Sequence, residues 1–191
     1  MSGDLTTLEA LKRYLGREGS DEAGQTSDEL LKQLISAASG QITRFASREF
    51  VASEDGEERA FAHDGGRFLD LAPYDLRSVD TITVTRDGSS TVLEAGQFGL
   101  RPLPAPDGVH QWIQLADDPG ESEITIKGAW GFEQVPADVA NWTHLTVAEW
   151  LRGGVYAYTQ DLEAAALYSS RSLPRIVETG IEDTYRQPVV T

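Results

Sequence analysis

The hydrophobic period of this chain changes twice, and this change constrains the fold more than any other feature of the sequence. Between residues 30 and 45, apolar side chains recur every three or four positions, which is the spacing of one helix face. Between residues 60 and 127 apolar and polar residues alternate, as they do in half-buried β-strands. Helical spacing returns after Pro136. Because helices and strands are segregated along the chain, the sequence predicts an α+β fold rather than an alternating α/β fold.

Two helices are expected before the strands. The first covers residues 6–15, with Thr6 and Glu9 in the spacing of a capping box and Gly16 as a left-handed stop. The second starts with another capping box, Thr26 and Glu29, and its apolar stripe fades over residues 47–50. Its small residues 37–40 permit close approach of a neighbouring helix.

The middle of the chain predicts antiparallel strands. Asp87-Gly88 is typical of a two-residue hairpin turn, since both of its central residues adopt positive φ. Residues 117–120 indicate a second turn, and the prolines at 102, 104 and 106 indicate an irregular loop. The expected strands are residues 60–62, 68–71, 79–84, 91–93, 111–115 and 123–127.

Helices are expected again in the last third of the chain. One runs from Pro136 to about residue 151, and a second is expected over residues 155–168, after Gly153-Gly154. A last helix begins near Leu173, carries a narrow apolar stripe at four-residue spacing, is weakened by Gly180 and ends at Pro188.

These patterns predict a helical bundle with an inserted antiparallel β-rich block. Residues 1–50 and 133–170 would supply the N- and C-terminal helices of the bundle. Residues 51–132 would form the β-rich insertion, and residues 171–191 a C-terminal arm.

Net charge and composition exclude several classes of protein. The 191 residues carry a formal charge of −15, which disfavours binding to nucleic acid or anionic lipid through a basic face. The acidity serves solubility, or it forms a wall past which DNA slides without sticking. With no cysteine, the chain has no disulfides, thiolate metal sites or cysteine nucleophiles. We see neither a signal peptide nor a membrane span, and expect a protein that is soluble where it is made.

No catalytic or metal-binding pattern is present. The three histidines, His63, His110 and His144, are not at metal-ligand spacing, and no GxSxG elbow or phosphate-binding glycine loop occurs. His63-Asp64 could imitate a ligand pair, but the glycines that follow indicate a turn. We interpret His144 as a packed or solvated residue, and the acidic runs as solvated loops. We therefore predict no catalytic residue, no cofactor and no metal.

The four tryptophans are interpreted as packing residues rather than as a ligand platform. They are Trp112, Trp130, Trp142 and Trp150. Trp130 is the most conspicuous, because glycines at 128 and 131 flank it where the chain leaves the predicted sheet.

The chain resembles the head–tail connector (adaptor) family of tailed phages and similar prophage proteins. Three passages, spanning residues 5 to about 152, carry the resemblance through their order and spacing. The first is residues 5–15 followed by residues 29–50, which fit the pattern LLxxLIxAAxxxIxxxxxRxF. The second is the proline-containing corner LAPYDLRSV at residues 71–79. The third is ITIKGAWG at residues 124–131, followed by VPADV at residues 135–139 and a helix.

The resemblance implies a structural virion protein rather than an enzyme. Such a protein would form a homo-oligomeric ring, commonly of twelve subunits, under the portal, and DNA would pass through its channel during genome ejection. It would be made in the cytoplasm of the bacterial host and would reside in the virion at the head–tail junction. Its partners would be other copies of itself, the portal protein, and a stopper or tail-terminator protein, with no membrane and no sequence-specific DNA binding.

The C-terminal arm is our hypothesis for the portal-docking segment. Its apolar stripe is narrow, and its end lacks helical signals. The proposed interface residues are Leu173, Ile176, Val177, Ile181 and Tyr185. The alternative is an ordinary terminal helix packed on its own subunit.

Three other functions stay open at this stage. A neck stopper or tail completion protein is similar in kind, but stoppers and terminators are mostly β. An enzyme using carboxylates would need a buried acid or an acid–histidine pair in a cleft. A small-molecule binding module would need a deep apolar pocket with convergent polar groups.

Overall fold

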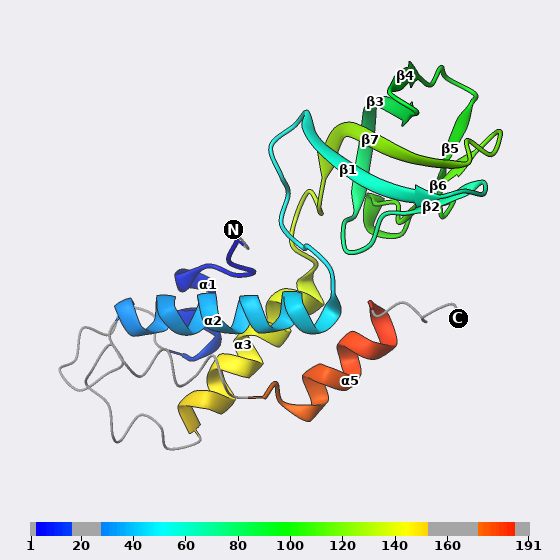
Figure 1. Cartoon of the computed structure of the whole chain (residues 1–191). Coiled ribbons are helices and arrows are strands. Elements are labelled where there is room, and N and C mark those ends of the chain that lie inside the picture. Colours follow the sequence, from blue (N-terminus) through cyan, green and yellow to red (C-terminus); the bar gives the residue numbers. More distant parts are fainter. Residues whose placement is uncertain (1–2, 17–27, 153–171, 186–191) are drawn as a thin grey trace. The chain divides into compact units, whose positions relative to one another are not determined.

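The computed structural model describes residues 3–16, 28–152 and 172–185. The chain divides into two compact units (Figure 1). The helical unit is formed within Met1–Ser47 and Val135–Thr191, and the β unit is Arg48–Gln134. The fold is therefore α+β, with helices from both ends of the chain and a β block inserted between them. The helix expected over residues 155–168 and the cap at Thr26 lie outside the described residues.

The described part of the helical unit contains four α-helices. They are α1 (Leu8–Tyr14), α2 (Asp28–Ala46), α3 (Ala137–Arg152) and α5 (Arg175–Thr184). Helix α2 contacts the other three, and α3 also contacts α5. The predicted apolar stripe of α2 is the side that is buried, because only this side removes enough apolar surface from water to stabilise the bundle. The core residues at the α1–α2–α3 contact are Leu11, Leu31, Leu34, Ile35, Ala38, Val147 and Trp150.

The first helix begins one residue later than its sequence pattern indicates. The N-cap is Thr7, whose hydroxyl accepts a hydrogen bond from the Ala10 amide at 3.2 Å. Thr6 is not the cap, because its hydroxyl lies 2.6 Å from Nε2 of His144 on α3. The local capping signal at Thr6 is thus overridden by a tertiary hydrogen bond.

Helix α5 packs closely against α3 at Gly180. A Cβ atom at this position would lie 2.7 Å from Cζ2 of Trp142, so only glycine allows the helices to approach this far. Tyr185, which caps the helix, donates a hydrogen bond to Oδ1 of Asp138 at 3.0 Å and packs edge-on against Trp142. Gly180 costs helix propensity but makes this helix contact possible.

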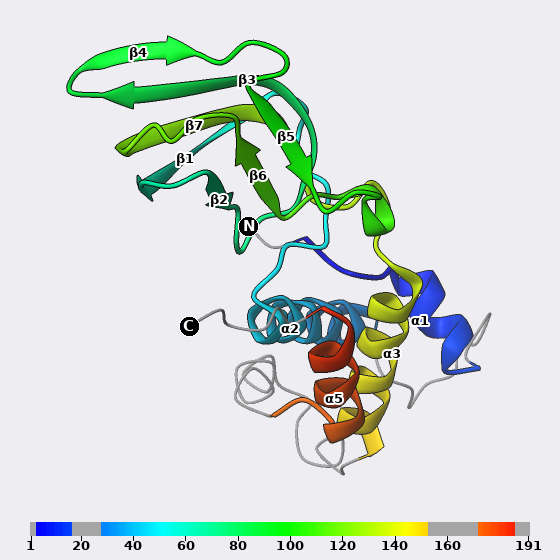
Figure 2. The same ribbon diagram turned by 90° about the vertical axis from the view of Figure 1, so that its right-hand side faces the viewer.

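The β unit contains two antiparallel sheets packed face to face (Figure 2). The four-stranded sheet has the order β1 (Glu57–Asp64), β7 (Glu121–Trp130), β3 (Leu76–Arg86), β4 (Ser89–Val92). The three-stranded sheet has the order β2 (Phe68–Asp70), β6 (Trp112–Leu115), β5 (Phe98–Arg101). Chain connections join β1 to β2 and β4 to β5, so each edge strand of the four-stranded sheet is followed by an edge strand of the three-stranded sheet.

The core of the β unit lies between the two sheets. It is built from inward-facing residues of both sheets, as the predicted alternation requires. Its fully or largely buried members are Leu69, Leu71, Leu76, Ile82, Val84, Ile113, Leu115, Ile124, Ile126 and Trp130. Strand β5 was missing from the sequence-based prediction, because its four residues include only Phe98 and Leu100 as alternating apolar positions.

Turn chemistry in the β unit follows the sequence signals. Asp87 and Gly88 have φ values of 50° and 77°, as the predicted hairpin between β3 and β4 requires. Residues 117–120 form the turn between β6 and β7. A short 3-10 helix, Pro106–Gly108, follows the proline-rich stretch after β5.

The two chain segments that lead into and out of the β unit are held side by side. We call these contacts the clasp. The Ser53 amide donates to the Trp130 carbonyl at 3.0 Å, and the Gly131 amide donates to the Asp75 carbonyl at 2.7 Å. Gly131 has a φ of 71°, and a Cβ there would lie 2.0 Å from the Val51 carbonyl oxygen. No other residue type fits this close approach.

A buried ion pair and an aromatic pair complete the clasp. Arg48 binds both carboxylate oxygens of Asp75, with its Nε 3.0 Å from Oδ2. The guanidinium also lies over the ring of Phe132, whose ring centroid is 5.5 Å from that of Phe50. Residues 48–50 therefore belong to the β unit, and α2 ends at Ala46.

Candidate functional site

The three histidines are occupied by structural contacts. Nε2 of His63 lies 3.1 Å from the Gly66 carbonyl oxygen, and Nδ1 of His110 lies 3.2 Å from the Pro102 carbonyl oxygen. Among residues 3–16, 28–152 and 172–185, no group of three or more His, Asp or Glu side chains could hold a metal ion. The same part of the chain contains no helix long and apolar enough to cross a membrane.

His144 is the only histidine with a shifted pKa in the described residues. Its Nε2 contacts the Thr6 hydroxyl, and its ring lies 5.2 Å from that of Tyr14. Burial lowers the pKa of His144, so the neutral imidazole is favoured. Its Nδ1 is buried without a hydrogen-bond partner, so the carboxylate that orients the histidine of a catalytic triad is missing. The Thr6–His144 pair therefore has two of the three parts that such a triad needs.

Among residues 3–16, 28–152 and 172–185, two carboxylates have shifted pKa values, and both have structural roles. Burial raises the pKa of Asp75, and the hydrogen bond and charge of Arg48 oppose this effect. The Gly120 and Gly66 amides, which donate to Asp118 at 2.7 and 2.8 Å, lower the pKa of Asp118. Asp118 thus shapes the turn between β6 and β7 and ties it to the turn after β1.

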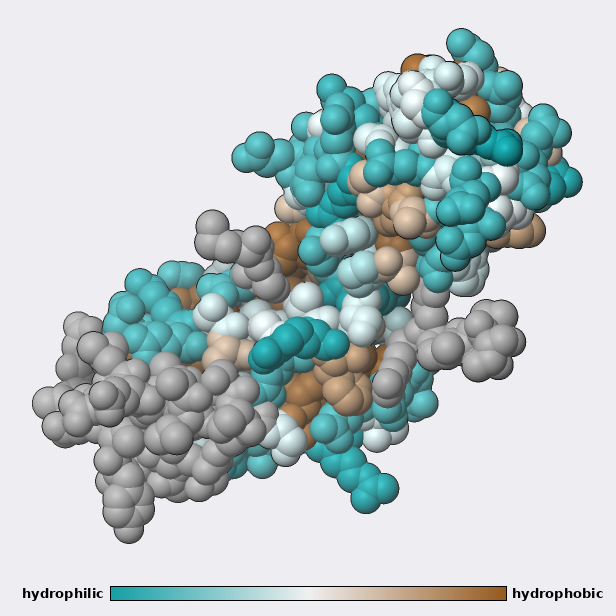
Figure 3. Space-filling view, in the orientation of Figure 1, coloured by the Kyte–Doolittle hydropathy of each residue, from teal (hydrophilic) through white to brown (hydrophobic). Residues whose placement is uncertain are grey.

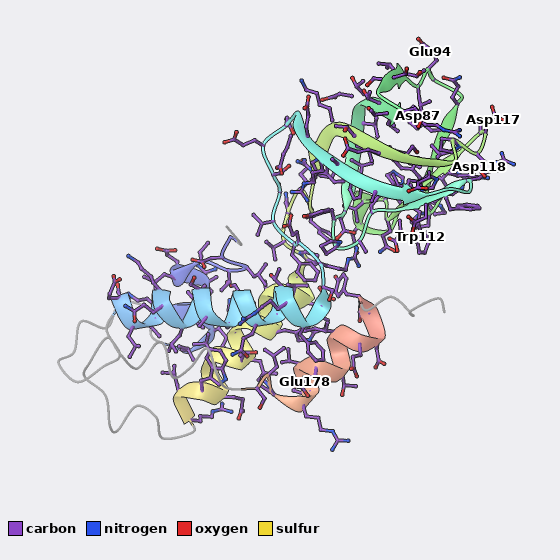
Figure 4. All side chains as sticks on the ribbon, in the orientation of Figure 1. Asp87, Glu94, Trp112, Asp117, Asp118 and Glu178 are labelled. Atoms are coloured by element: carbon purple, nitrogen blue, oxygen red, sulfur yellow. The ribbon has the colours of Figure 1, made fainter. Side chains whose placement is uncertain are left out.

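Negative charge is concentrated in the β unit. Residues 48–134 contain 17 acidic and 7 basic side chains, a net formal charge of −10 out of the −15 of the whole chain. Several acids gather at the end of the four-stranded sheet away from the clasp, where Asp64, Asp87 and Glu121 line an open hollow. Figure 4 labels Asp87, Asp117 and Asp118 on this unit. An anionic ligand such as a nucleic-acid phosphate is repelled here.

The five residues of the hypothetical portal interface divide between the two sides of α5. Leu173, Val177, Ile181 and Tyr185 are buried within the helical unit, where α5 contacts α2 and α3. Ile176 lies on the opposite side and is 69% exposed. Four of the five thus hold α5 to its own chain, and only Ile176 is open to a partner.

The outer side of the three-stranded sheet carries an exposed aromatic surface that the sequence analysis missed. Leu69, Ile113 and Leu100 face the core, so their neighbours along each strand face outward. We call this outer side the aromatic face. It consists of Phe68, Asp70, Gly99, Arg101, Trp112 and Gln114.

Two aromatic residues and one arginine dominate the aromatic face. Phe68 is 63% exposed, and Trp112, interpreted from sequence as a packing residue, is only partly buried. Nε of Arg101 donates to Oε1 of Gln114 at 3.1 Å, which holds the guanidinium on this face. The signal for Trp112 was present in the sequence, because Ile113 and Leu115 alternate with it.

The outer side of the four-stranded sheet is different in character, and we call it the threonine face. Its central row runs across all four strands and contains only small or uncharged side chains. This row is Ala60, Thr125, Thr83 and Val92, which are partners in the strand register. Next to it, Glu123 lies between Ala62 and Thr85 in the register. Figure 3 shows a largely hydrophilic surface on the β unit, interrupted by smaller hydrophobic patches.

Comparison with known proteins rests on structure, because neither a protein-family model nor a curated protein matches the sequence. A chain of the neck of an empty gene transfer agent (GTA) particle, computed with C6 symmetry, matches with a TM-score of 0.56 and 17% identity. The match covers 100% of this chain and 97% of that one. A chain of the virion of a native GTA particle matches with the same TM-score and identity, over 99% and 96% of the two chains. At 17% identity, the likeness shows that this chain shares their fold.

Proposed function

We propose that this protein is a structural subunit of a phage-type neck, an adaptor that forms a ring between the portal and the tail. The observation that carries the proposal is the fold likeness to a chain of a GTA neck, which covers 100% of this chain and 97% of that one. Because the match spans both units, it supports the same combination of helical unit and β unit in the two chains, and not only a similarity of one unit. The protein would act in the virion at the head–tail junction, after synthesis in the bacterial host.

The ring would contain about twelve copies, the number expected from the resemblance to adaptors. That number is compatible with the sixfold symmetry used for the GTA neck. Portal protein would lie on one side of the ring, and a stopper or tail-terminator protein on the other. DNA would pass through the channel during genome ejection. The role needs no catalytic residue and no cofactor.

The acidity of the chain supports a channel through which DNA passes without binding. Each phosphate that a protein neutralises releases counterions and adds affinity, so a basic lining would hold DNA back. A chain with a net charge of −15 has the opposite property. The β unit, which carries −10 of this charge, is the part that we expect to face DNA.

We retain helix α5 as the portal-docking segment, with a narrower contact than the sequence suggested. Leu173, Val177, Ile181 and Tyr185 would keep α5 on its own helical unit, and the exposed side around Ile176 would contact the portal. Deleting α5 would expose Trp142 to solvent and destabilise the helical unit. A loss of portal binding after this deletion would therefore not distinguish docking from misfolding.

A point substitution tests portal docking without removing buried contacts. Ile176→Asp should weaken portal binding at least tenfold, because a charged carboxylate replaces an apolar side chain at the contact. Titration of the full-length variant onto purified portal, followed by light scattering, measures the effect. Thr91→Asp, an exposed change on strand β4 of the β unit, is the control for added charge. Unchanged binding of Ile176→Asp would contradict the docking role of α5.

The molar mass of the protein in solution, alone and with portal, tests the adaptor function. Light scattering on a sizing column should show the chain alone as a single copy or small oligomer, and as one copy per portal subunit once portal is added. A chain that stays monomeric in the presence of portal would contradict the adaptor function.

A neck stopper or tail completion protein is the second candidate, because the fold likeness is to a neck chain without specifying its position. The paired N-terminal helices α1 and α2 favour the adaptor over a stopper, since stoppers are mostly β. A stopper would bind to a portal already occupied by an adaptor, and not to the portal alone. The same sizing experiment with both portal preparations separates the two.

A further inference from the structure

The aromatic face presents an arginine that has no carboxylate partner among the described residues. The Arg101 guanidinium donates to Oε1 of Gln114 and to the Leu100 carbonyl oxygen, and it makes no ion pair with another described residue. Beside it in the strand register lies Trp112, and Phe68 is diagonal to Trp112 on the next strand. An aromatic pair with an oriented guanidinium has the composition typical of the centre of a protein–protein interface.

The threonine face presents the complementary charge. Glu123 is exposed and makes no ion pair within the described part of the chain. Lys127, on the same strand and the same side of the sheet, lies 4.0 Å from Glu58. Arg86 lines the hollow beside Glu123 but donates to the Pro119 carbonyl oxygen. Next to Glu123 is the uncharged row across the four strands, which ends at Val92, 54% exposed. A sheet surface of small side chains leaves room for the large aromatic rings of a partner.

The two faces lie on opposite sides of one sandwich, because each is the outward side of a sheet whose inward side forms the shared core. A ring requires this arrangement. In a closed ring, each subunit contacts its neighbours through two different surfaces, one on each side.

We infer that the aromatic face of one copy packs on the threonine face of the next copy, with Arg101 opposite Glu123 and the Phe68–Trp112 pair over the uncharged row. The occupant of both faces is thus a second copy of this chain. The inference rests on the proposed ring function and adds the surfaces that hold the ring together.

The size of the faces sets the strength of the contact. Strands about 4.8 Å apart with a rise of about 3.3 Å per residue give the larger sheet a face of roughly 500 Å². A stable interface buries about 800 Å² on each partner. The sheet contact alone is therefore weak, and we expect it to assemble at high concentration or on a portal template rather than as free dimers.

Charge reversal tests the pairing. Arg101→Glu and Glu123→Arg should each raise the concentration needed for assembly, alone and on portal, on the order of tenfold, because like charges then meet across the contact. The double variant Arg101→Glu/Glu123→Arg should recover most of this loss. Both positions are on the surface of the sheets, and circular dichroism and thermal unfolding verify that each variant folds.

Cross-linking tests the geometry independently of charge. Since the chain has no cysteine, Phe68→Cys and Thr125→Cys each introduce the only thiol. Mixing the two full-length variants with a short bis-maleimide should yield linked pairs that contain one of each. Phe68→Cys mixed with Thr179→Cys is the matched control, and it should remain largely unlinked.

Different outcomes separate this inference from the function on which it rests. If Arg101→Glu assembles normally, or if the double variant assembles no more readily than the single variants, the proposed contact between the two faces is wrong and the adaptor function is unaffected. If Phe68→Cys alone gives as many linked pairs as the mixture, the inference is also wrong, because the aromatic faces of two copies then contact each other. A wild-type chain that forms no ring, with or without portal, overturns the adaptor function and this inference together.

Discussion

At the scale of single residues, the polar groups buried in this protein maintain structure. Arg48 and Asp75 satisfy each other inside the clasp. Removing one partner of such a pair leaves a buried charge unpaired, which is strongly destabilising, although the intact pair adds little net stability. His144 differs, because its Nδ1 has no partner and its neutral form is favoured.

His144 makes the stability of the protein sensitive to mild acid. The pKa of His144 is lowered in the folded state, so below pH 6.5 the unfolded chain takes up a proton that the folded chain resists. The free energy of unfolding should then fall as the pH drops, by at most about 1.4 kcal/mol per pH unit. His144→Gln should lack this contribution. Urea unfolding of both proteins between pH 7.5 and 5.5 measures the difference, and parallel pH profiles would contradict the assignment.

At the scale of elements, helix α5 shows how a weak local signal is offset by packing. Its glycine is unfavourable for a helix, yet Gly180 lies against the Trp142 ring and allows α5 to pack on α3. The apolar stripe of α5 was correctly located in the sequence. Its burial against α2 and α3 depended on contacts between distant segments, which no local pattern reveals.

Gly180→Ala should destabilise the protein although alanine is the better helix former. In an open position the change would add about 1 kcal/mol of helix stability. Here the new Cβ would lie 2.7 Å from the Trp142 ring, and the displacement of α5 should cost about 1–3 kcal/mol. Thr179→Ala, on the exposed side of the same helix, should be neutral or stabilising. Thermal unfolding compares the two, and a stabilised Gly180→Ala would contradict the close packing.

At the scale of the whole molecule, the clasp gives the inserted β unit its own closed core. The segments that lead into and out of the sandwich are bound to each other by backbone hydrogen bonds. The unit also has a continuous core between its two sheets.

A fragment of residues 48–134 should therefore fold alone and unfold cooperatively. Circular dichroism should show a β-rich spectrum with a single thermal transition. Gly131→Ala in the same fragment should abolish or strongly weaken folding, because its Cβ would lie 2.0 Å from the Val51 carbonyl oxygen. An unstructured wild-type fragment would show that the sandwich requires the helical unit.

The sequence by itself determined the α+β class, the order of the described helices and strands other than β5, and the Asp87-Gly88 hairpin. These depend on local spacing and on the φ preferences of single residues, which are written directly in the chain. Tertiary structure alone decided that Thr6 binds His144 instead of capping its helix, that Gly180 lies against Trp142, and that four residues of the expected docking stripe are buried. It also placed Arg101 and Glu123 on different sheets, where neither forms an ion pair with another described residue. Each of these outcomes depends on segments far apart in the sequence, whose contacts arise only when the two cores are packed.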